Sequence, residues 1–295
     1  MLPPVTLSVV IITYNEEVNL WRTLESVQPL ICDGKGEIIV VDSGSTDRTV
    51  EIAESYGARV FVEEWKGFAA QKNSAIDKAC GEWILSLDAD EEVEPELLEE
   101  ICWVLEAARA WDQYGFPVDV DSRSIELRDR GTQYGLDEED LNGFFIPRKN
   151  LFLGRWIKHG GFWPDRKLRL FRKGKGIFQN RSVHETVQTE GTAANTKQGA
   201  LLHHSYPTLS DYIEHMNRYS SLGAEMVVAK THGRVRFSAS NILLRPLATF
   251  VYNYFFRLGF LDGREGLLLH LYHSAYVSWK YSKAWEISRD NRKTG

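Results

Sequence analysis

The 295-residue sequence has only three cysteines and no long uninterrupted apolar segment, and both absences limit what the protein can be. Cys32, Cys80 and Cys102 form neither a CxxC pair nor a metal-binding spacing, which argues against a disulfide framework and a zinc module. An odd cysteine count fits a reducing compartment. Cys80 and Cys102 fall in predicted helices, where we expect them to be small core residues.

A surplus of positive charge is also missing, because the net charge is −6. This charge argues against a general nucleic-acid binder. The amino terminus has no basic segment ahead of its first apolar run, so we expect a first strand there and not a signal peptide. Neither GxGxxG nor GxxxxGK[ST] occurs, and a dinucleotide-dependent oxidoreductase or a P-loop enzyme therefore loses support.

Short apolar runs alternate with helical patterns over the first ninety residues. Strands are predicted over residues 7–13, 37–41, 59–62 and 83–87. The segments between the runs have helical spacing or helix-capping residues. This alternation is typical of an α/β protein whose parallel sheet is joined by right-handed crossovers.

The pattern changes in the middle of the chain. A helix is predicted over residues 95–105, and residues 107–141 then read as a polar, irregular insertion. Residues 143–149 resume a strand, and the alternation in residues 167–172 predicts a half-exposed strand. A capping box at residues 208–211 predicts a helix to about residue 230. We therefore expect one catalytic domain over residues 1–235.

The remaining residues, 236–295, form a predicted helical region. Residues 242–261 are rich in aromatic and aliphatic side chains, but charged and polar residues interrupt them, so a transmembrane helix is not expected. Residues 268–279 have an amphipathic pattern, with basic Lys280 and Lys283 following. This stretch and residues 242–261 both suit an anchor that lies in a membrane interface. A layer packed on the catalytic domain, or a homodimer contact, explains the same pattern equally well.

The end of the fourth predicted strand is strongly acidic, since Leu87 is followed by Asp88, Ala89, Asp90 and two glutamates. Buried strands do not end in four carboxylates for packing reasons, because each charge is costly to desolvate. Open α/β sheets place ligands at such strand ends. Two carboxylates there fit Mg²⁺ or Mn²⁺ shared with substrate phosphates. A solvated acidic turn before the next helix is the simpler alternative.

Further polar residues follow the other strands. Thr13, Asn15 and Glu16 come after the first, and Asp42 after the second. Asp42 could accept hydrogen bonds from a ribose or a base, or could be an ordinary turn residue. Lys72, on a predicted helix, could meet a phosphate or lie on a solvated face.

Three ordered segments, residues 9–17, 40–47 and 87–91, resemble family 2 glycosyltransferases over roughly residues 7–100. Residues 161–166, 169–172 and 183–185 are similar to one branch of that family, which includes lipopolysaccharide inner-core β-1,4-glucosyltransferases. The resemblance implies an inverting enzyme with a GT-A fold. It also implies a nucleotide-sugar donor. The branch resemblance indicates a UDP-hexose and favours UDP-glucose.

The same resemblance implies an acceptor that is a lipopolysaccharide-core or lipid-linked saccharide, at the cytoplasmic face of the membrane. The insertion over residues 107–141 departs from the compact members of the family. It bears on the identity of the acceptor and not on the chemistry of the donor. The residues expected to bind the donor are Thr13, Asn15, Glu16, Asp42, Lys72, Asp88, Ala89 and Asp90, with Asp90 and Asp88 as the metal ligands.

Inverting transfer is a direct displacement, so the acceptor hydroxyl needs one general base. A downstream carboxylate is required, and Glu185 is the first candidate and Asp165 the second. Glu185 could equally be part of a surface salt bridge. The ambiguous residues nearby are three histidines, candidate metal or phosphate contacts, and three arginines, candidate phosphate contacts or a solvated strand face: His184, His203, His204, Arg166, Arg169 and Arg172.

Two other functions remain open on the sequence. A nucleotidyltransferase or sugar-nucleotide pyrophosphorylase also uses carboxylate-bound Mg²⁺, but residues 1–20 contain no glycine or arginine for a phosphate-binding loop. A non-catalytic, carbohydrate-binding GT-A scaffold would not need Asp42, Asp88 and Asp90. A glycosidase needs two facing carboxylates but neither metal nor nucleotide.

Overall fold

The computed structural model describes residues 6–31, 34, 36–114, 132, 134, 141–179 and 186–294. The chain divides into two compact units. The described part of the first comprises residues 6–31, 34, 36–114, 132, 134, 141–148, 166–179 and 186–203, and that of the second residues 149–165 and 204–294. A catalytic domain over residues 1–235, separable from residues 236–295, stays a prediction.

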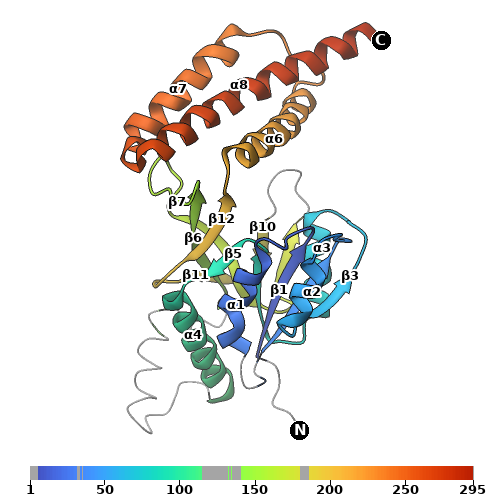
Figure 1. Cartoon of the computed structure of the whole chain (residues 1–295), viewed down its shortest axis with the longest axis vertical. Helices are drawn as coiled ribbons and strands as arrows, with labels where there is room; N and C mark the ends of the chain where they lie inside the picture. The colour runs from blue at the N-terminus through green and yellow to red at the C-terminus, as the bar shows by residue number, and fades with distance from the viewer. Residues whose placement is uncertain are drawn as a thin grey trace. The chain divides into compact units, whose positions relative to one another are not determined.

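The first unit is built on the parallel strands that the sequence predicts. β1 (Leu7–Thr13), β2 (Gly36–Asp42), β3 (Arg59–Val62) and β4 (Trp83–Asp88) lie in the order β3-β2-β1-β4. All three pairings in this row are parallel. The connecting helices are α1 (Leu20–Ile31), α2 (Thr49–Ser55) and α3 (Phe68–Lys78) (Figure 1). The carboxyl ends of β1, β2 and β4 therefore meet at one edge, as expected.

The sheet continues beyond β4 as β4-β8-β6-β12-β5, and β8 pairs antiparallel to β4. Its further strands are β5 (Glu91–Val93), β6 (Leu141–Phe152), β8 (Asp165–Arg172), β11 (Thr192–Asn195) and β12 (Leu201–Tyr206). A separate antiparallel pair is formed by β9 (Gly176–Gln179) and β10 (Thr186–Thr189). The mixed, mostly parallel sheet with its helices confirms the expected α/β class.

The continuous apolar runs of the parallel strands are explained by burial on both faces. Val9 and Ile11 of β1 pack in one core cluster with side chains of α1 and α4. Val10, between them, packs in a second cluster with side chains of α3. Successive side chains of a strand point to opposite faces, so a strand covered on both sides needs apolar residues at every position.

Helix α4 (Pro95–Tyr114) runs nine residues past the end expected at Leu105, so the first part of the predicted insertion is helical and not irregular. Ala107 and Ala108 are fully buried and continue the packing face of Ile101 and Val104. Small residues extended a helical face where we expected the pattern to fail.

The two described cysteines are exposed, so the expectation that they are core residues is wrong. Cys102 lies on α4 beside Ile101, which takes the buried position. Cys80 follows the last turn of α3. Cys32 lies outside the described residues.

The second unit contains α6 (Leu209–Lys230), α7 (Arg245–Val251) and α8 (Gly263–Thr294), with short helical turns η2 (Ser240–Leu244), η3 (Tyr252–Phe256) and η4 (Gly259–Asp262) (Figure 1). β7 (Arg155–Trp156) pairs with the end of β6. The predicted capping box is confirmed: the Thr208 hydroxyl accepts from the Asp211 backbone N–H, and the Asp211 carboxylate accepts from the Thr208 backbone. No helix in the described ranges has the length and hydropathy to span a bilayer.

Helix α8 packs along α6, and this contact uses residues that we expected to face lipid. Lys283 Nζ donates to Asn217 Oδ1 at 2.7 Å and to the hydroxyls of Ser220 and Ser221 at 2.8 and 2.9 Å. Leu271, expected on the apolar face, is 49% exposed, whereas His270 and Leu269 beside it are buried. Leu268 and Tyr272 pack against the cluster around Phe152 and Tyr212, so the apolar pattern of residues 268–279 coincides only in part with the packed side of α8.

An ion-pair cluster at β3 and α3 makes the stability of the first unit sensitive to acid. Glu63 accepts from Lys78 at 2.5 Å, Lys66 at 2.9 Å and the Ser74 hydroxyl at 2.7 Å. Hydrogen bonds from Lys78, Lys66 and Ser74 lower the pKa of Glu63 to about 2. A depressed carboxyl pKa stabilises the fold above the unfolded pKa of about 4.3, and this stabilisation is lost as the pH falls towards 2.

We expect Glu63→Gln to lower the free energy of unfolding by about 1–2 kcal/mol at pH 7, allowing for solvent screening, and by less as the pH falls from 4.5 towards 2. Urea unfolding at a series of pH values measures the difference. Glu54→Gln, on the exposed side of α2, is the matched control and should change little at any pH. A cost for Glu63→Gln that is the same at pH 3 and pH 7 would contradict the assignment.

Candidate active site

Asp88, the last residue of β4, lies among three cations. Lys72 Nζ is 2.7 Å from its Oδ1, Arg169 Nη2 is 2.5 Å from its Oδ2, and Arg148 Nη1 is 3.9 Å from Oδ2. Burial alone would raise the pKa of Asp88, but the charges of Arg169 and Lys72 outweigh it and hold the pKa well below its usual value. Lys72 is 6% exposed, so its alternative interpretation as a solvated helix residue is wrong.

Glu91 holds both arginines of this cluster through hydrogen bonds. Its side chain is fully buried and accepts from Arg169 at 2.6 Å, from Arg148 at 3.1 Å and from the Asp88 backbone N–H at 3.0 Å. Burial would lower the pKa of Arg169, but the carboxylates of Asp88 and Glu91 raise it above the usual value. Arg169 thus remains a cation inside the protein, paired on two sides.

The prediction that residues 167–172 form a half-exposed strand is wrong, and the pairing of Arg169 explains why. Residues 168–171 of β8 are all buried, because Arg169 points to buried carboxylates and not to water. A polar–apolar alternation predicts solvent on the polar side only where no ion pair is buried there. For Arg169 the alternative of a solvated strand face is therefore wrong, while Arg166 on the same strand is exposed.

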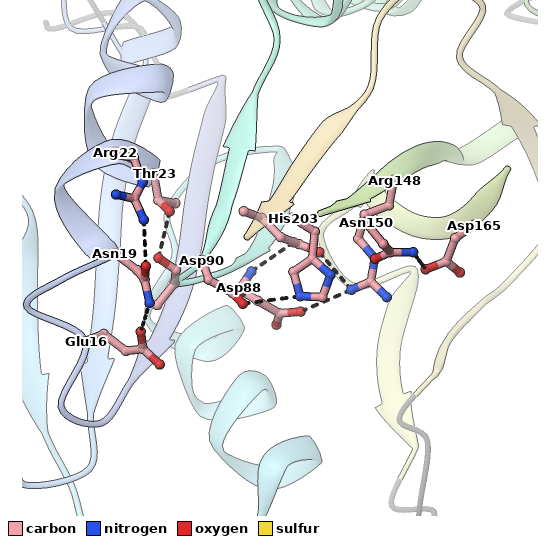
Figure 2. A network of polar contacts seen from close by, with 12 residues as sticks. Glu16, Asn19, Arg22, Thr23, Asp88, Asp90, Arg148, Asn150, Asp165 and His203 are labelled. Carbon is pink, nitrogen blue, oxygen red and sulfur yellow. Dashed lines mark hydrogen bonds and ion pairs between the residues drawn. The ribbon is translucent and has the colours of Figure 1, made fainter. Parts of the chain in front are cut away.

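Asp90 differs from Asp88 in that it forms an ion pair with a histidine. His203 Nε2, on β12, lies 3.3 Å from Asp90 Oδ2, and the two side chains are 17% and 24% exposed (Figure 2). Burial would raise the pKa of Asp90, but the interaction with His203 outweighs it and lowers the pKa. The Thr23 hydroxyl of α1 donates to the Ala89 carbonyl at 2.8 Å and so holds the loop between the two aspartates.

A second polar chain starts at Glu16 and runs along the first turns of α1. Asn19 Nδ2 donates to Glu16 at 3.0 Å, and Arg22 donates to Asn19 Oδ1 at 2.6 Å (Figure 2). Burial and, after it, the negative charges of Asp90 and Asp47 raise the pKa of Glu16, although the bond from Asn19 opposes them. Glu16 therefore belongs to the same electrostatic environment as the acidic strand end.

Asp42 is fully buried and organises the loop after β2. It accepts from the Thr13 hydroxyl at 2.8 Å, from the backbone N–H groups of Gly44 and Ser45 at 2.9 and 2.7 Å, and from the Ser45 hydroxyl at 2.5 Å. Donor binding by Asp42 and Thr13 stays a prediction. In this structure both side chains stabilise the turn after β2.

Asn15 joins the loops after β1 and β2. Its backbone N–H donates to Ser45 Oγ at 2.8 Å, and its side-chain oxygen accepts from the Thr46 backbone N–H at 2.9 Å. Asn15 has φ +53°, a left-handed conformation that asparagine tolerates better than most residues. Asn15 thus connects the two loops by hydrogen bonds, and its contact with the donor stays a prediction.

The two candidate bases are placed differently. In the second unit, Asn150 Nδ2 donates to Asp165 Oδ2 at 3.2 Å (Figure 2). The segment before Asp165 is held by buried Asp262, which accepts from the His159 backbone N–H at 2.8 Å and lies 2.9 Å from His159 Nδ1. Glu185 and His184 lie outside the described residues.

Sequence reasoning missed four residues of the site: Glu91, Arg148, Asn19 and Arg22. Arg148 is brought to Glu91 by the pairing order of distant strands, which no local pattern reveals. The spacing of Glu16, Asn19 and Arg22 in steps of three is a helical-face signal and could have found that chain. Glu91 was visible as part of the acidic run, but nothing local shows that it is buried.

The residues present suit a divalent cation whose coordination is completed by oxygen atoms of a substrate. Within the described ranges no group of three or more His, Cys, Asp or Glu side chains is arranged to hold a metal ion. Mg²⁺ is commonly bound by one or two carboxylates together with substrate phosphates, so a smaller set is sufficient. Asp90 with His203 offers such a set, whereas both oxygens of Asp88 already accept from cations.

Comparisons with known proteins agree on one family. The family model described as glycosyl transferase family 2 matches residues 8–172. The lipopolysaccharide core biosynthesis glycosyltransferase LpsC of Rhizobium meliloti is 30% identical over 269 residues, 89% of this chain and 84% of that protein. An uncharacterized glycosyltransferase of Rickettsia felis is 44% identical over 108 residues, 37% of this chain and 36% of its own.

Among solved structures, S. aureus TarS 1-349 in complex with UDP is similar at a TM-score of 0.45 and 16% identity, covering 98% of this chain and 92% of that one.

Proposed function

Because this chain belongs to glycosyl transferase family 2 and is a glycosyltransferase, we propose that it transfers a hexose from a UDP sugar to a lipopolysaccharide-core or other lipid-linked saccharide. Glucose is the sugar favoured by the branch that the sequence resembles. The name of the LpsC relative supports an acceptor in the lipopolysaccharide core. We place the reaction at the cytoplasmic face of the cytoplasmic membrane, where such acceptors are built on lipid.

The observation that carries the proposal is the charge balance at the end of β4. Three cations and three carboxylates are packed there, so the formal charges of the cluster cancel. The six residues are Lys72, Arg148, Arg169, Asp88, Asp90 and Glu91. The anionic diphosphate of a donor would enter a site without net positive charge, and a divalent cation would supply the charge that is missing.

Asp90 and His203 are the residues that we propose to hold this cation. Asp88 was also expected to do so, but it would have to give up a contact with Lys72 or Arg169. When bound, Mg²⁺ or Mn²⁺ would stabilise the charge that develops on the departing nucleoside diphosphate. Lys72 and Arg148 would orient the phosphates. Glu16 lies close enough to Asp90 and Asp88 for their charges to raise its pKa, and Asn15 precedes it in the same loop.

The acceptor hydroxyl must lose its proton to a carboxylate, and Glu185 and Asp165 are the two candidates. We expect Glu185→Gln to leave UDP binding intact and to lower transfer roughly 10²–10⁴-fold, the usual scale for removal of a general base. Asp165→Asn is the matched comparison. UDP affinity is measured by calorimetry and transfer by UDP release. Normal transfer by Glu185→Gln together with loss in Asp165→Asn would reverse the ranking.

A donor screen tests the proposed function directly. Purified protein is titrated by calorimetry with UDP-glucose, UDP-galactose and GDP-mannose, with and without Mn²⁺, and slow donor hydrolysis is followed as UDP release. We expect UDP-glucose to bind, and its binding and hydrolysis to fall when EDTA is in excess. Binding of nucleoside triphosphates but of no nucleotide sugar would instead favour a nucleotidyltransferase. Binding of saccharide alone would favour the non-catalytic scaffold.

A further inference from the structure

The second unit carries an apolar surface that its own side chains leave uncovered. Six large apolar residues between η2 and η3 are each more than half exposed, and Phe256 is the most exposed at 76%. We call them the apolar face: Leu243, Leu244, Leu247, Tyr252, Phe255 and Phe256. They lie on the consecutive helical segments η2, α7 and η3. Leu243 and Leu247, and likewise Tyr252 and Phe256, are four residues apart, and residues at this spacing are neighbours on a helix surface. Exposed apolar surface of this extent marks an interaction site.

The charges of the segment that carries the apolar face have one sign. From residue 226 to residue 261 the sequence contains no aspartate and no glutamate, although the whole chain has a net charge of −6. The same stretch contains Lys230, Arg234, Arg236, Arg245 and Arg257. The four arginines are exposed. The occupant of this face must therefore be apolar at its centre and anionic at its border.

We propose that the apolar face inserts into the interface of an anionic lipid bilayer. Aromatic and leucine side chains bordered by arginines suit the boundary between acyl chains and headgroups, and each basic residue adds attraction to anionic lipids. A second copy of the chain fits less well. A symmetric contact would bring the same arginines together, with no carboxylate in this stretch to pair with them.

This surface belongs to one of the two stretches that the sequence indicated, residues 242–261, and not to the other. Lys283 of α8 is held by Asn217, Ser220 and Ser221 of α6, so it serves helix packing. The lipid-binding side chains are those of η2, α7 and η3. The inference rests on the proposed function for its purpose, which is to hold the enzyme beside a lipid-borne acceptor, but vesicle binding itself needs no sugar.

The test uses the full-length protein and vesicles of phosphatidylcholine, with or without phosphatidylglycerol, in co-sedimentation at low and at raised salt. We expect binding to the phosphatidylglycerol vesicles that weakens with salt. The double variant Leu244→Ser, Phe256→Ser should bind at least about tenfold more weakly, because two large apolar side chains are lost from the contact. The matched control is Val62→Ser, Ile177→Ser, which removes two exposed apolar side chains of the first unit and should bind like the wild type.

Three outcomes would overturn the inference. The wild type could fail to sediment with anionic vesicles at low salt, or the control could lose binding as strongly as the double variant. Sedimentation equilibrium could also reveal a dimer that the double variant dissolves, which would make a second copy the occupant. UDP binding is measured on the same samples. Vesicle binding without UDP-sugar binding would defeat the proposed function and leave this inference standing.

Discussion

Replacing Asp90 with alanine should lower sugar transfer by roughly 10²–10³-fold or more, the scale seen when a group that stabilises transition-state charge is removed. Asp90 and His203 form the pair that we propose for the cation, and the alanine variant leaves the imidazole alone. The fold should remain intact. Asp90 raises the pKa of Glu16 by repulsion, so its removal relieves strain between like charges.

UDP release measures the activity of Asp90→Ala, and thermal unfolding measures its stability. Asp77→Ala is the matched control, because Asp77 is exposed on α3. We expect the control to transfer sugar normally. We also expect the wild type in excess EDTA to behave like the Asp90 variant. Full activity of Asp90→Ala, or activity that EDTA does not change, would rule out this role for the acidic strand end.

Replacing Arg169 with methionine should lower the free energy of unfolding by about 3–5 kcal/mol, as breaking a buried ion pair from one side does. Glu91 is fully buried and would keep only Arg148 as a charged partner among the contacts described above. Urea unfolding measures the loss. Arg166→Met, an exposed position on the same strand, should change stability by less than about 0.5 kcal/mol.

A double variant separates the lost pair from the lost volume. In the double variant Arg169→Met, Glu91→Gln, a neutral amide replaces the buried carboxylate of Glu91. We therefore expect the double variant to recover part of the stability that Arg169→Met loses. The free energy of unfolding of Arg169→Met could instead lie within about 1 kcal/mol of the wild-type value. The guanidinium would then be hydrated, and the buried ion pairs would not be what holds β8 against residues 88–91.

The sequence was sufficient for the parallel half of the sheet and for the acidic strand end. Buried parallel strands are continuous apolar runs, and parallel topology alone brings Asp42 and Asp88 to one edge. The partners of those acids could not be predicted. Arg148 and His203 reach them through pairings between distant strands. Polar–apolar alternation likewise cannot distinguish a hydrated Arg169 from one that is paired inside the protein.

The helical region shows a similar limit. The sequence located helices there, but an amphipathic pattern does not reveal which side a neighbouring helix takes. The buried positions of α8 include His270, Ser274 and Ser288, which a hydrophobic pattern leaves out. The sequence marked residues 242–261 as an interrupted apolar run that suits an interfacial anchor, but it did not show which of these side chains are exposed. Its exposure depends on tertiary packing and could not be read from composition.

The pairing of β5 with β12 has a consequence for how an active molecule is made. β5 follows β4 almost directly, yet residues 91–93 pair with residues 201–203, and this pairing sets His203 opposite Glu91 and beside Asp90. Contacts between residues far apart in sequence form late, because a long loop must close before they contribute. A nascent chain would therefore complete its parallel half well before the histidine arrives. If His203 holds the cation as proposed, a chain that is still being made and lacks residues 201–203 cannot consume the nucleotide sugar.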